Sequence, residues 1–144
     1  MNEQQPEVKT KALVVLSGGQ DSATCLFWAK QNYHEVHAIT FNYGQRHKIE
    51  IESAKMVAKL AGVESHEILD LPAGILAGTS PLVNKSETVP EYDSEEEMPD
   101  GVAKTFVPMR NQFFLTIAAN RAFVLGCNVL VTGVCETDYS GYPD

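Results

Sequence analysis

Apolar residues in the first part of the chain form short runs that alternate with helical spacing. Val14 to Leu16 are uninterrupted and apolar, which is typical of a strand buried on both faces. A helix follows, fading at Gln31 and Asn32, and the positions expected to face the sheet are Ala23, Leu26, Phe27 and Lys30. Val36 to Phe41 repeats the strand pattern and ends at a turn signal, Asn42-Tyr43-Gly44.

The same alternation continues further along the chain. Gln45 to Ala61 is predicted as a helix that Gly62 ends, and its inward positions are Ile51, Ala54, Ala58 and Ala61. A third strand is expected from about Ser65 to Leu71. A last helix begins at Arg110 and stops at Gly126, with one face formed by Leu115, Ala118, Ala119, Ala122 and Leu125. Val129 to Val134 is predicted as a buried strand.

Strands that alternate with helices predict an α/β fold with right-handed crossovers and a parallel sheet, whose ligands bind at the carboxyl ends of the strands. We expect one domain over residues 11–144, preceded by a flexible polar tail over residues 1–10. Between Pro72 and Lys104 the periodicity fails, and this segment holds seven of the nineteen acidic residues. It is interpreted as an acidic loop or lid.

Charge and cysteine content narrow the class of function. The formal net charge of −8 disfavours sequence-independent binding to nucleic acid, so a small-molecule substrate is favoured. Three cysteines, Cys25, Cys127 and Cys135, lack ligand spacing and are interpreted as buried thiols in a reducing compartment. Because the chain has no secretory apolar segment and no run of membrane-spanning length, we expect a cytoplasmic protein that does not contact the membrane.

The turn after the first strand carries the clearest chemistry. In Ser17-Gly18-Gly19-Gln20-Asp21-Ser22, two glycines allow positive φ and close approach of a ligand, and the N–H groups of the helix start face a negative group. Ser17 and Ser22 add hydroxyl donors. Because the Asp21 carboxylate would repel a phosphate unless a divalent cation lay between them, Asp21 is predicted as a Mg²⁺ ligand. An ordinary glycine-rich strand-to-helix turn is the alternative.

Other candidate residues follow later strands. Arg110 begins a helix, where a guanidinium suits phosphate oxygens, although a surface arginine or one paired with a lid carboxylate is the alternative. Gly133 allows a ligand or another part of the backbone to come close. Near the end of the chain, aromatic rings could stack on a flat heterocycle, and carboxylates could accept hydrogen bonds from its N–H groups. An ordinary surface turn is the alternative. The residues concerned are Tyr139, Tyr142, Glu136 and Asp138.

Four segments together resemble a known family. Ser17 to Ser22 matches the SGGxDS pattern of PP-loop ATP pyrophosphatases. With Thr40 to His47, Thr105 to Asn111 and Thr132 to Asp144, it closely resembles the QueC family of queuosine biosynthesis, over nearly the whole chain from Lys11 onward. The resemblance implies a Rossmann-like adenine nucleotide alpha hydrolase (PP-loop) fold. It also implies an ATP-dependent ligase that converts 7-carboxy-7-deazaguanine and ammonia into the nitrile through an amide.

The resemblance also implies roles for individual residues. Asp21 (through Mg²⁺) and Arg110 are the expected catalytic residues. The expected ATP contacts are Leu16, Ser17, Gly18, Gly19, Gln20, Asp21, Ser22, Ala23, Thr24, Cys25, Leu26, Thr40, Phe41, Asn42 and Gly133. Backbone around Thr40 to Asn42 would meet the adenine. The expected substrate contacts are Gln45, Arg46, His47, Arg110, Asn111, Glu136, Asp138, Tyr139 and Tyr142.

One departure from the family is visible. Family members continue past the equivalent of Asp144 and carry cysteines that bind Zn²⁺, and this chain has no such cluster. The full-length family is expected to form homodimers, and this chain is interpreted as a truncated or split version, with a complementing C-terminal chain as one source of the remainder. Two other readings stay open: another PP-loop ATPase, such as a tRNA-modifying enzyme, and a non-catalytic nucleotide-binding half-domain.

Overall fold

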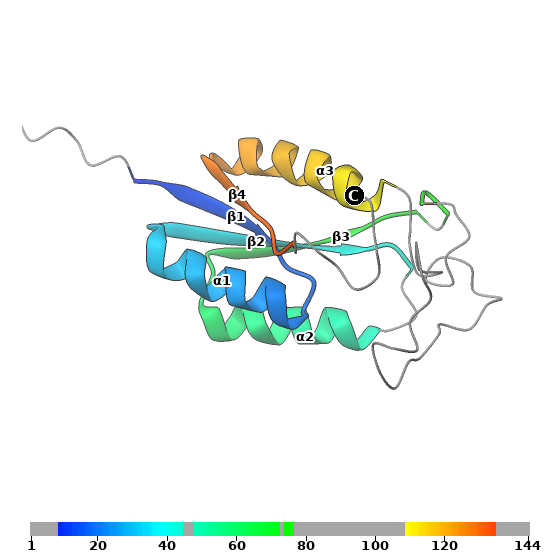
Figure 1. The fold of residues 1–144 in the computed structure, drawn as a ribbon, viewed down its shortest axis with the longest axis horizontal. Helices are drawn as coiled ribbons and strands as arrows, with labels where there is room; N and C mark the ends of the chain where they lie inside the picture. The colour runs from blue at the N-terminus through cyan, green and yellow to red at the C-terminus, as the bar shows by residue number, and fades with distance from the viewer. Residues whose placement is uncertain (1–8, 45–47, 73, 77–108, 135–144) are drawn as a thin grey trace, which may run out of the picture.

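A computed structural model describes residues 9–44, 48–72, 74–76 and 109–134. Along the chain the elements are β1 (Lys11–Val15), α1 (Gln20–Asn32), β2 (Glu35–Asn42), α2 (Lys48–Ala61), β3 (Ser65–Asp70), α3 (Arg110–Leu125) and β4 (Val129–Val131). The strands form one parallel sheet in the order β3-β2-β1-β4 (Figure 1). The predicted parallel α/β fold is therefore confirmed.

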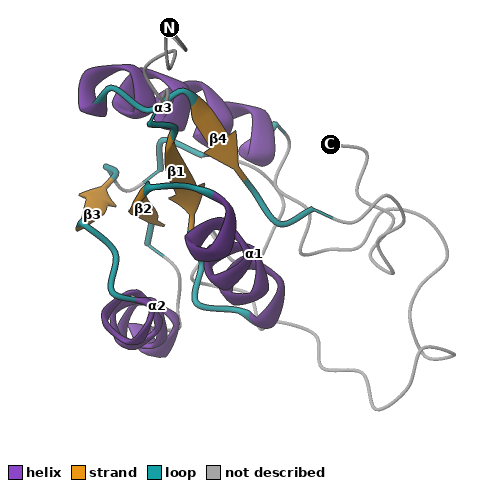
Figure 2. Ribbon diagram, turned by 90° about the vertical axis from the view of Figure 1, so that its left-hand side faces the viewer, coloured by secondary structure: helices purple, strands orange, loops and turns teal. Residues whose placement is uncertain are grey.

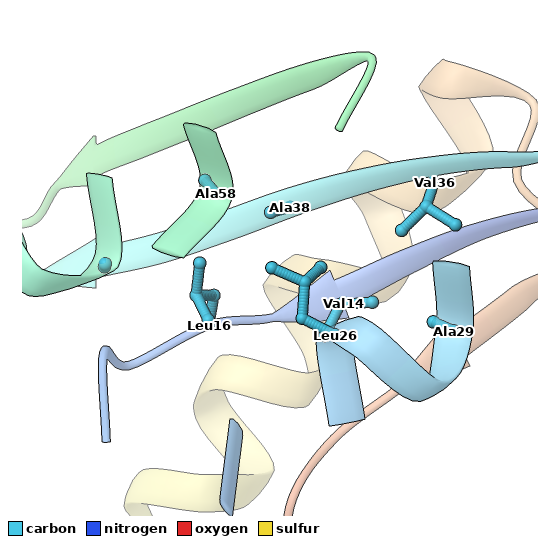
Figure 3. Packing of buried hydrophobic residues seen from close by; sticks show 8 residues of the cluster. Val14, Leu16, Leu26, Ala29, Val36, Ala38 and Ala58 are labelled. Atoms are coloured by element: carbon cyan, nitrogen blue, oxygen red, sulfur yellow. The ribbon is translucent and has the colours of Figure 1, made fainter. Parts of the chain in front are cut away.

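Helices cover both faces of the sheet. Helices α1 and α2 lie on one face and α3 lies on the other, as Figure 2 shows. Consecutive β1 residues therefore enter different cores: Leu13 packs on the α3 side and Val14 on the side of α1 and α2. The α1 and α2 core contains Val14, Leu16, Leu26, Ala29, Val36, Ala38, Ala54 and Ala58 (Figure 3). Helices on both faces explain why consecutive residues of β1 and β2 are buried without alternation.

Two helices differ from their predicted inward faces. In α1 the buried residues are Ser22, Leu26 and Ala29, whereas Phe27 is 45% exposed. Phe27 lies about 100° around the helix from Leu26, so its ring points away from the face of α1 that packs on the sheet. In α3, Ala118 and Ala122 are buried as predicted, but Ala119 is exposed. The large side chains that α3 contributes to the core are instead Phe113 and Phe114, which pack on the cluster around Leu13.

Strand β4 is shorter and less buried than predicted. It ends at Val131 rather than Val134, and its three residues are only half-buried. Among the described strands, β4 pairs with β1 alone, so it has one neighbouring strand instead of two, which agrees with its lower burial. Past Val131 the chain leaves the ladder and approaches α1.

The remaining expectations about organisation are tested only in part. Cys25 and Cys127 are free thiols that are half-buried rather than fully buried, and Cys135 lies outside the described residues. So do residues 1–8, most of the acidic segment over 72–104, and Gln45 to His47, which were predicted as the start of α2. No helix within the described ranges has the length and hydropathy needed to cross a membrane.

Candidate functional site

The turn between β1 and α1 packs directly on α2. Gly18 has φ +92°, a left-handed conformation that glycine adopts without strain. A Cβ atom at Gly18 would collide with the carbonyl oxygen of Glu50 and would lie 2.9 Å from the amide nitrogen of Ala54. On the same side, the Ser53 hydroxyl donates to the Gly18 carbonyl at 2.9 Å. The first glycine of the pair is therefore required both for the bend and for contact with the second helix.

Two serines give the turn its shape. The amide of Ser17 donates to Ser22 Oγ at 3.1 Å, and the Ser22 hydroxyl donates to the Gly19 carbonyl at 3.1 Å. The two hydroxyl oxygens are 3.0 Å apart. Because the single hydroxyl proton of Ser22 is donated to Gly19, the Ser17 hydroxyl is the donor in the bond between the two serines. The Gly19 amide donates to Ser17 Oγ at 3.2 Å. Both hydroxyls predicted as anion donors thus take part in bonds inside the turn.

Open amides lie at the start of α1. The first intrahelical bond runs from the Ala23 amide to the Gly19 carbonyl at 3.0 Å, and Gly19 as N-cap offers no side chain. Among the described residues, no acceptor contacts the amides of Gln20, Asp21 or Ser22. These donors and the positive end of the helix dipole favour an anion. The exposed Asp21 carboxylate, with no ion pair inside the described part of the chain, stands beside them.

Gly133, two residues after the end of β4, packs against the first turn of α1. A Cβ atom at Gly133 would lie 3.1 Å from the carbonyl carbon of Asp21 and 3.2 Å from the amide nitrogen of Ser22. The sequence left open whether a ligand or the backbone approaches Gly133. In the structure the backbone of α1 does so.

Side chains at the end of β2 are engaged inside the protein. Thr40 is buried, and its hydroxyl donates to the Leu16 carbonyl at 2.6 Å. The Phe41 ring stacks on Phe114 with centroids 4.4 Å apart. Asn42 Nδ2 donates to Asp70 Oδ1 at 2.7 Å. These three side chains therefore make contacts inside the protein, and the Asn42 carbonyl accepts from the Leu71 amide at 2.7 Å. The expected backbone contacts to adenine stay a prediction.

The other predicted nucleotide contacts lie on or next to α1. Leu16 and Leu26 are fully buried in the core, so their contribution is the position of the backbone. Gln20 and Thr24 are exposed, Ala23 and Cys25 are half-buried, and the Thr24 hydroxyl donates to the Gln20 carbonyl at 2.9 Å.

Arg110 and Asn111 are the first two residues of α3 and are half-buried. Since α3 leads into the parallel strand β4, its amino end lies at the carboxyl edge of the sheet, together with those of α1 and α2 (Figure 1). The remaining predicted substrate contacts lie outside the described residues: Gln45, Arg46, His47, Glu136, Asp138, Tyr139 and Tyr142.

Two polar residues at this site were missed by sequence reasoning. Ser53 holds Gly18, as described above, and His66 Nε2 lies 2.7 Å from Thr40 Oγ1. Burial, and to a smaller extent the positive charge of Lys55, lowers the pKa of His66. Ser53 was detectable as a polar neighbour of the inward Ala54. Only strand order, however, brings α2 next to the turn after β1.

The donor set fits one of the two metals implied by the resemblance. A single exposed carboxylate beside open amides suits Mg²⁺, which binds proteins through one or two carboxylates and takes further ligands from phosphates and water. Zinc needs a cluster of sulfur or nitrogen ligands, and in the described ranges no group of three or more His, Cys, Asp or Glu is placed to hold a metal. The described residues therefore do not fit a zinc site.

Several classes of nucleotide-binding α/β protein have a parallel sheet with a glycine turn between the first strand and the first helix. The Ser17 to Ser22 sequence in this turn, which matches SGGxDS, is typical of the PP-loop class. Two solved structures share this fold: a predicted subunit of a tRNA methyltransferase from Methanocaldococcus jannaschii (TM-score 0.54, 20% identity, covering 94% of this chain and 58% of that one) and an NH3-dependent NAD synthetase from Campylobacter jejuni (TM-score 0.51, 18% identity, covering 89% and 47%).

The family model "Queuosine biosynthesis protein QueC" matches residues 11–144, and the chain belongs to this family. A curated relative, 7-cyano-7-deazaguanine synthase from Gloeobacter violaceus, is 55% identical over 134 residues. The match covers 93% of this chain and 56% of the relative, so the chain spans little more than half the length of that protein. The predicted family is confirmed.

Proposed function

We propose that this chain supplies the ATP-binding part of a ligase that converts 7-carboxy-7-deazaguanine and ammonia to 7-cyano-7-deazaguanine. The observation that carries the proposal is the row of open amides at Gln20, Asp21 and Ser22 beside the Asp21 carboxylate. Membership of the QueC family and 55% identity to a 7-cyano-7-deazaguanine synthase support the choice of substrate.

The chemistry requires activation twice. A carboxylate is a poor electrophile, so its oxygen first attacks the α-phosphate of ATP, which releases pyrophosphate and leaves the acyl group bonded to AMP. Ammonia attacks the acyl carbon, loses a proton and displaces AMP to give the amide. The amide oxygen then attacks the α-phosphate of a second ATP and again releases pyrophosphate. Departure of AMP with that oxygen and loss of the two N–H protons leave the nitrile. In such a reaction the protein chiefly positions the reactants and neutralises charge.

The proposed roles follow from the positions of the residues. The amides of Gln20, Asp21 and Ser22 bind the leaving phosphates. Asp21 would hold Mg²⁺, which would neutralise phosphate charge. Arg110, at the amino end of α3, is assigned to the charge that grows near the α-phosphate. To bond a phosphate oxygen, the Ser17 hydroxyl would turn away from Ser22, 3.0 Å distant.

The test is incubation of the chain with ATP, 7-carboxy-7-deazaguanine and ammonia, with nucleotide products measured in the presence and absence of the deazaguanine. Substrate-dependent turnover supports the ligase. ATP binding without turnover would instead favour the nucleotide-binding half-domain. Absence of ATP binding would contradict both.

Asp21→Asn tests the metal site. This variant keeps the size of the side chain but removes the negative charge, so the calorimetric affinity for Mg-ATP should fall about tenfold, while affinity for ATP without the metal should change little. Unchanged affinity for Mg-ATP would remove Asp21 from the metal site.

A further inference from the structure

A chain of two hydrogen bonds crosses the sheet and ends at the phosphate turn. Thr40, 2% exposed on β2, donates its hydroxyl proton to the Leu16 carbonyl at 2.6 Å. A carbonyl only accepts, and the hydroxyl has a single proton. His66 Nε2, 2.7 Å from Thr40 Oγ1, must therefore be the donor in its bond to Thr40. Hydrogen bonds are therefore donated in the order His66 to Thr40 to Leu16.

The last bond of this chain sets the direction of an amide in the turn. The Leu16 carbonyl and the Ser17 N–H belong to the same rigid peptide unit and point in opposite directions. Holding the carbonyl against Thr40 therefore aims the Ser17 N–H the other way, toward Ser22 Oγ at 3.1 Å. Ser22 in turn holds the Gly19 carbonyl at 3.1 Å. The orientation of one buried threonine is thus transmitted to both serines of the turn.

His66 removes the freedom that Thr40 would otherwise have. A lone hydroxyl rotates to suit its surroundings. With Nε2–H of His66 occupying an acceptor position of Oγ1, the proton of Thr40 is left to the Leu16 carbonyl. His66 is half-buried on β3, which is separated from β1 by β2, so the hydrogen bonds that link it to the turn run through Thr40.

We propose that His66 is a positioning residue for the phosphate turn, acting through the Thr40 hydroxyl on the peptide between Leu16 and Ser17. The inference rests on the proposed function in one respect, that this turn binds the phosphates of ATP. Its physical content, a fixed peptide orientation, is independent of that function.

The experiment compares His66→Leu, which removes the donor, with His66→Gln, whose side-chain amide keeps one. Mg-ATP affinity is measured by calorimetry and the Ser17 and Ser22 amides are followed by 1H–15N NMR. Because one hydrogen bond contributes about 0.5–1.5 kcal/mol, His66→Leu should weaken binding by about threefold to tenfold and shift both amide signals. His66→Gln should restore most of the affinity. In the unaltered chain, the imidazole 15N spectrum should show His66 protonated at Nε2.

Thr40→Val tests the same path at its middle. If His66 acts through Thr40, the double variant Thr40→Val with His66→Leu should bind no more weakly than Thr40→Val alone. Thr40→Ser keeps the hydroxyl and should retain most of the affinity. Full multiplication of the two single effects would overturn the proposal.

His37→Leu is the matched control, because His37 is also a histidine on a strand. Its two hydrogen bonds go to Ser65 and Glu35, and within the described residues none connects it to the turn. Both variants should lower thermal stability, and only His66→Leu should lower Mg-ATP affinity. Equal affinity losses would overturn the proposal. If the unaltered chain binds no nucleotide, the proposed function fails. The positioning role is then decided by NMR alone: unshifted Ser17 and Ser22 amide signals in His66→Leu would overturn it.

Discussion

The backbone of Gly133 packs against the backbone of Asp21, so closely that a Cβ atom at Gly133 would lie 3.1 Å from the Asp21 carbonyl carbon. Gly133 follows the edge strand β4, and Asp21 belongs to the first turn of α1. The position of the proposed phosphate-binding amides therefore depends on a residue more than a hundred positions further along the chain.

Gly133→Ala should displace the first turn of α1, because an added methyl group meets backbone atoms that a side-chain rotation cannot move aside. We expect a loss of about 1–3 kcal/mol in the free energy of unfolding, measured in urea, and a clear loss of Mg-ATP affinity in calorimetry. Gly62→Ala is the control: Gly62 has φ +64° but nothing within 4 Å of an added Cβ. It should lower stability and leave nucleotide affinity intact. A similar affinity in both variants would show that contact at Gly133 does not set the helix start.

Ser53→Ala should loosen the turn from the side of α2. The Gly18 carbonyl loses a 2.9 Å hydrogen bond, and the peptide unit that also carries the Gly19 amide becomes freer to rotate. We expect about 0.5–1.5 kcal/mol of lost stability and weaker binding of Mg-ATP. Ser65→Ala removes a comparable serine bond, to His37 at 2.7 Å, and should affect stability alone. An unchanged Mg-ATP affinity in Ser53→Ala would mean that the Gly18 peptide keeps its orientation without Ser53.

The order of elements and the location of the turn were predictable because each rests on local sequence. The run from Val14 to Leu16 and the glycine pair after it signal their conformation within a few residues. Contacts made by Ser53, His66 and Gly133 were not predictable in the same way. They depend on strand order, which places α2 beside the turn and β4 beside β1. The burial of β4 was overestimated for the same reason, since a run such as Val129 to Val134 does not reveal that its strand has a single neighbour among the described strands.

Met109→Gly should stabilise the protein. Met109 adopts φ 59° and ψ 16° at the start of α3, a left-handed conformation that costs a residue with a side chain about 1–2 kcal/mol. Its side chain is 59% exposed, so little packing is lost on removal. Allowing for the greater freedom of glycine in the unfolded chain, a net gain of about 1 kcal/mol is expected, seen as a higher melting temperature.

Met109→Asn should also stabilise, because asparagine tolerates this conformation, whereas Met109→Ala should not. If the alanine variant gains as much as the glycine variant, the gain comes from loss of the exposed side chain and not from relief of backbone strain.

Glu35 should make the protein less stable in acid. A hydrogen bond with His37 at 2.7 Å, and next a hydrogen bond from Lys11, lower the pKa of the Glu35 carboxyl below its ordinary 4.5. The folded state therefore binds fewer protons than the unfolded state, so this carboxylate stabilises the fold above the unfolded pKa. The contribution disappears as the pH falls through the lower, folded pKa. Glu35→Gln should flatten the decline of unfolding free energy below about pH 4.5, measured by urea titration from pH 7 to pH 3. Glu64→Gln, at an exposed carboxyl without an ion pair among the described residues, should leave the decline as it is. Equal flattening in both variants would show that general charge, and not the contacts of Glu35, sets the acid limit.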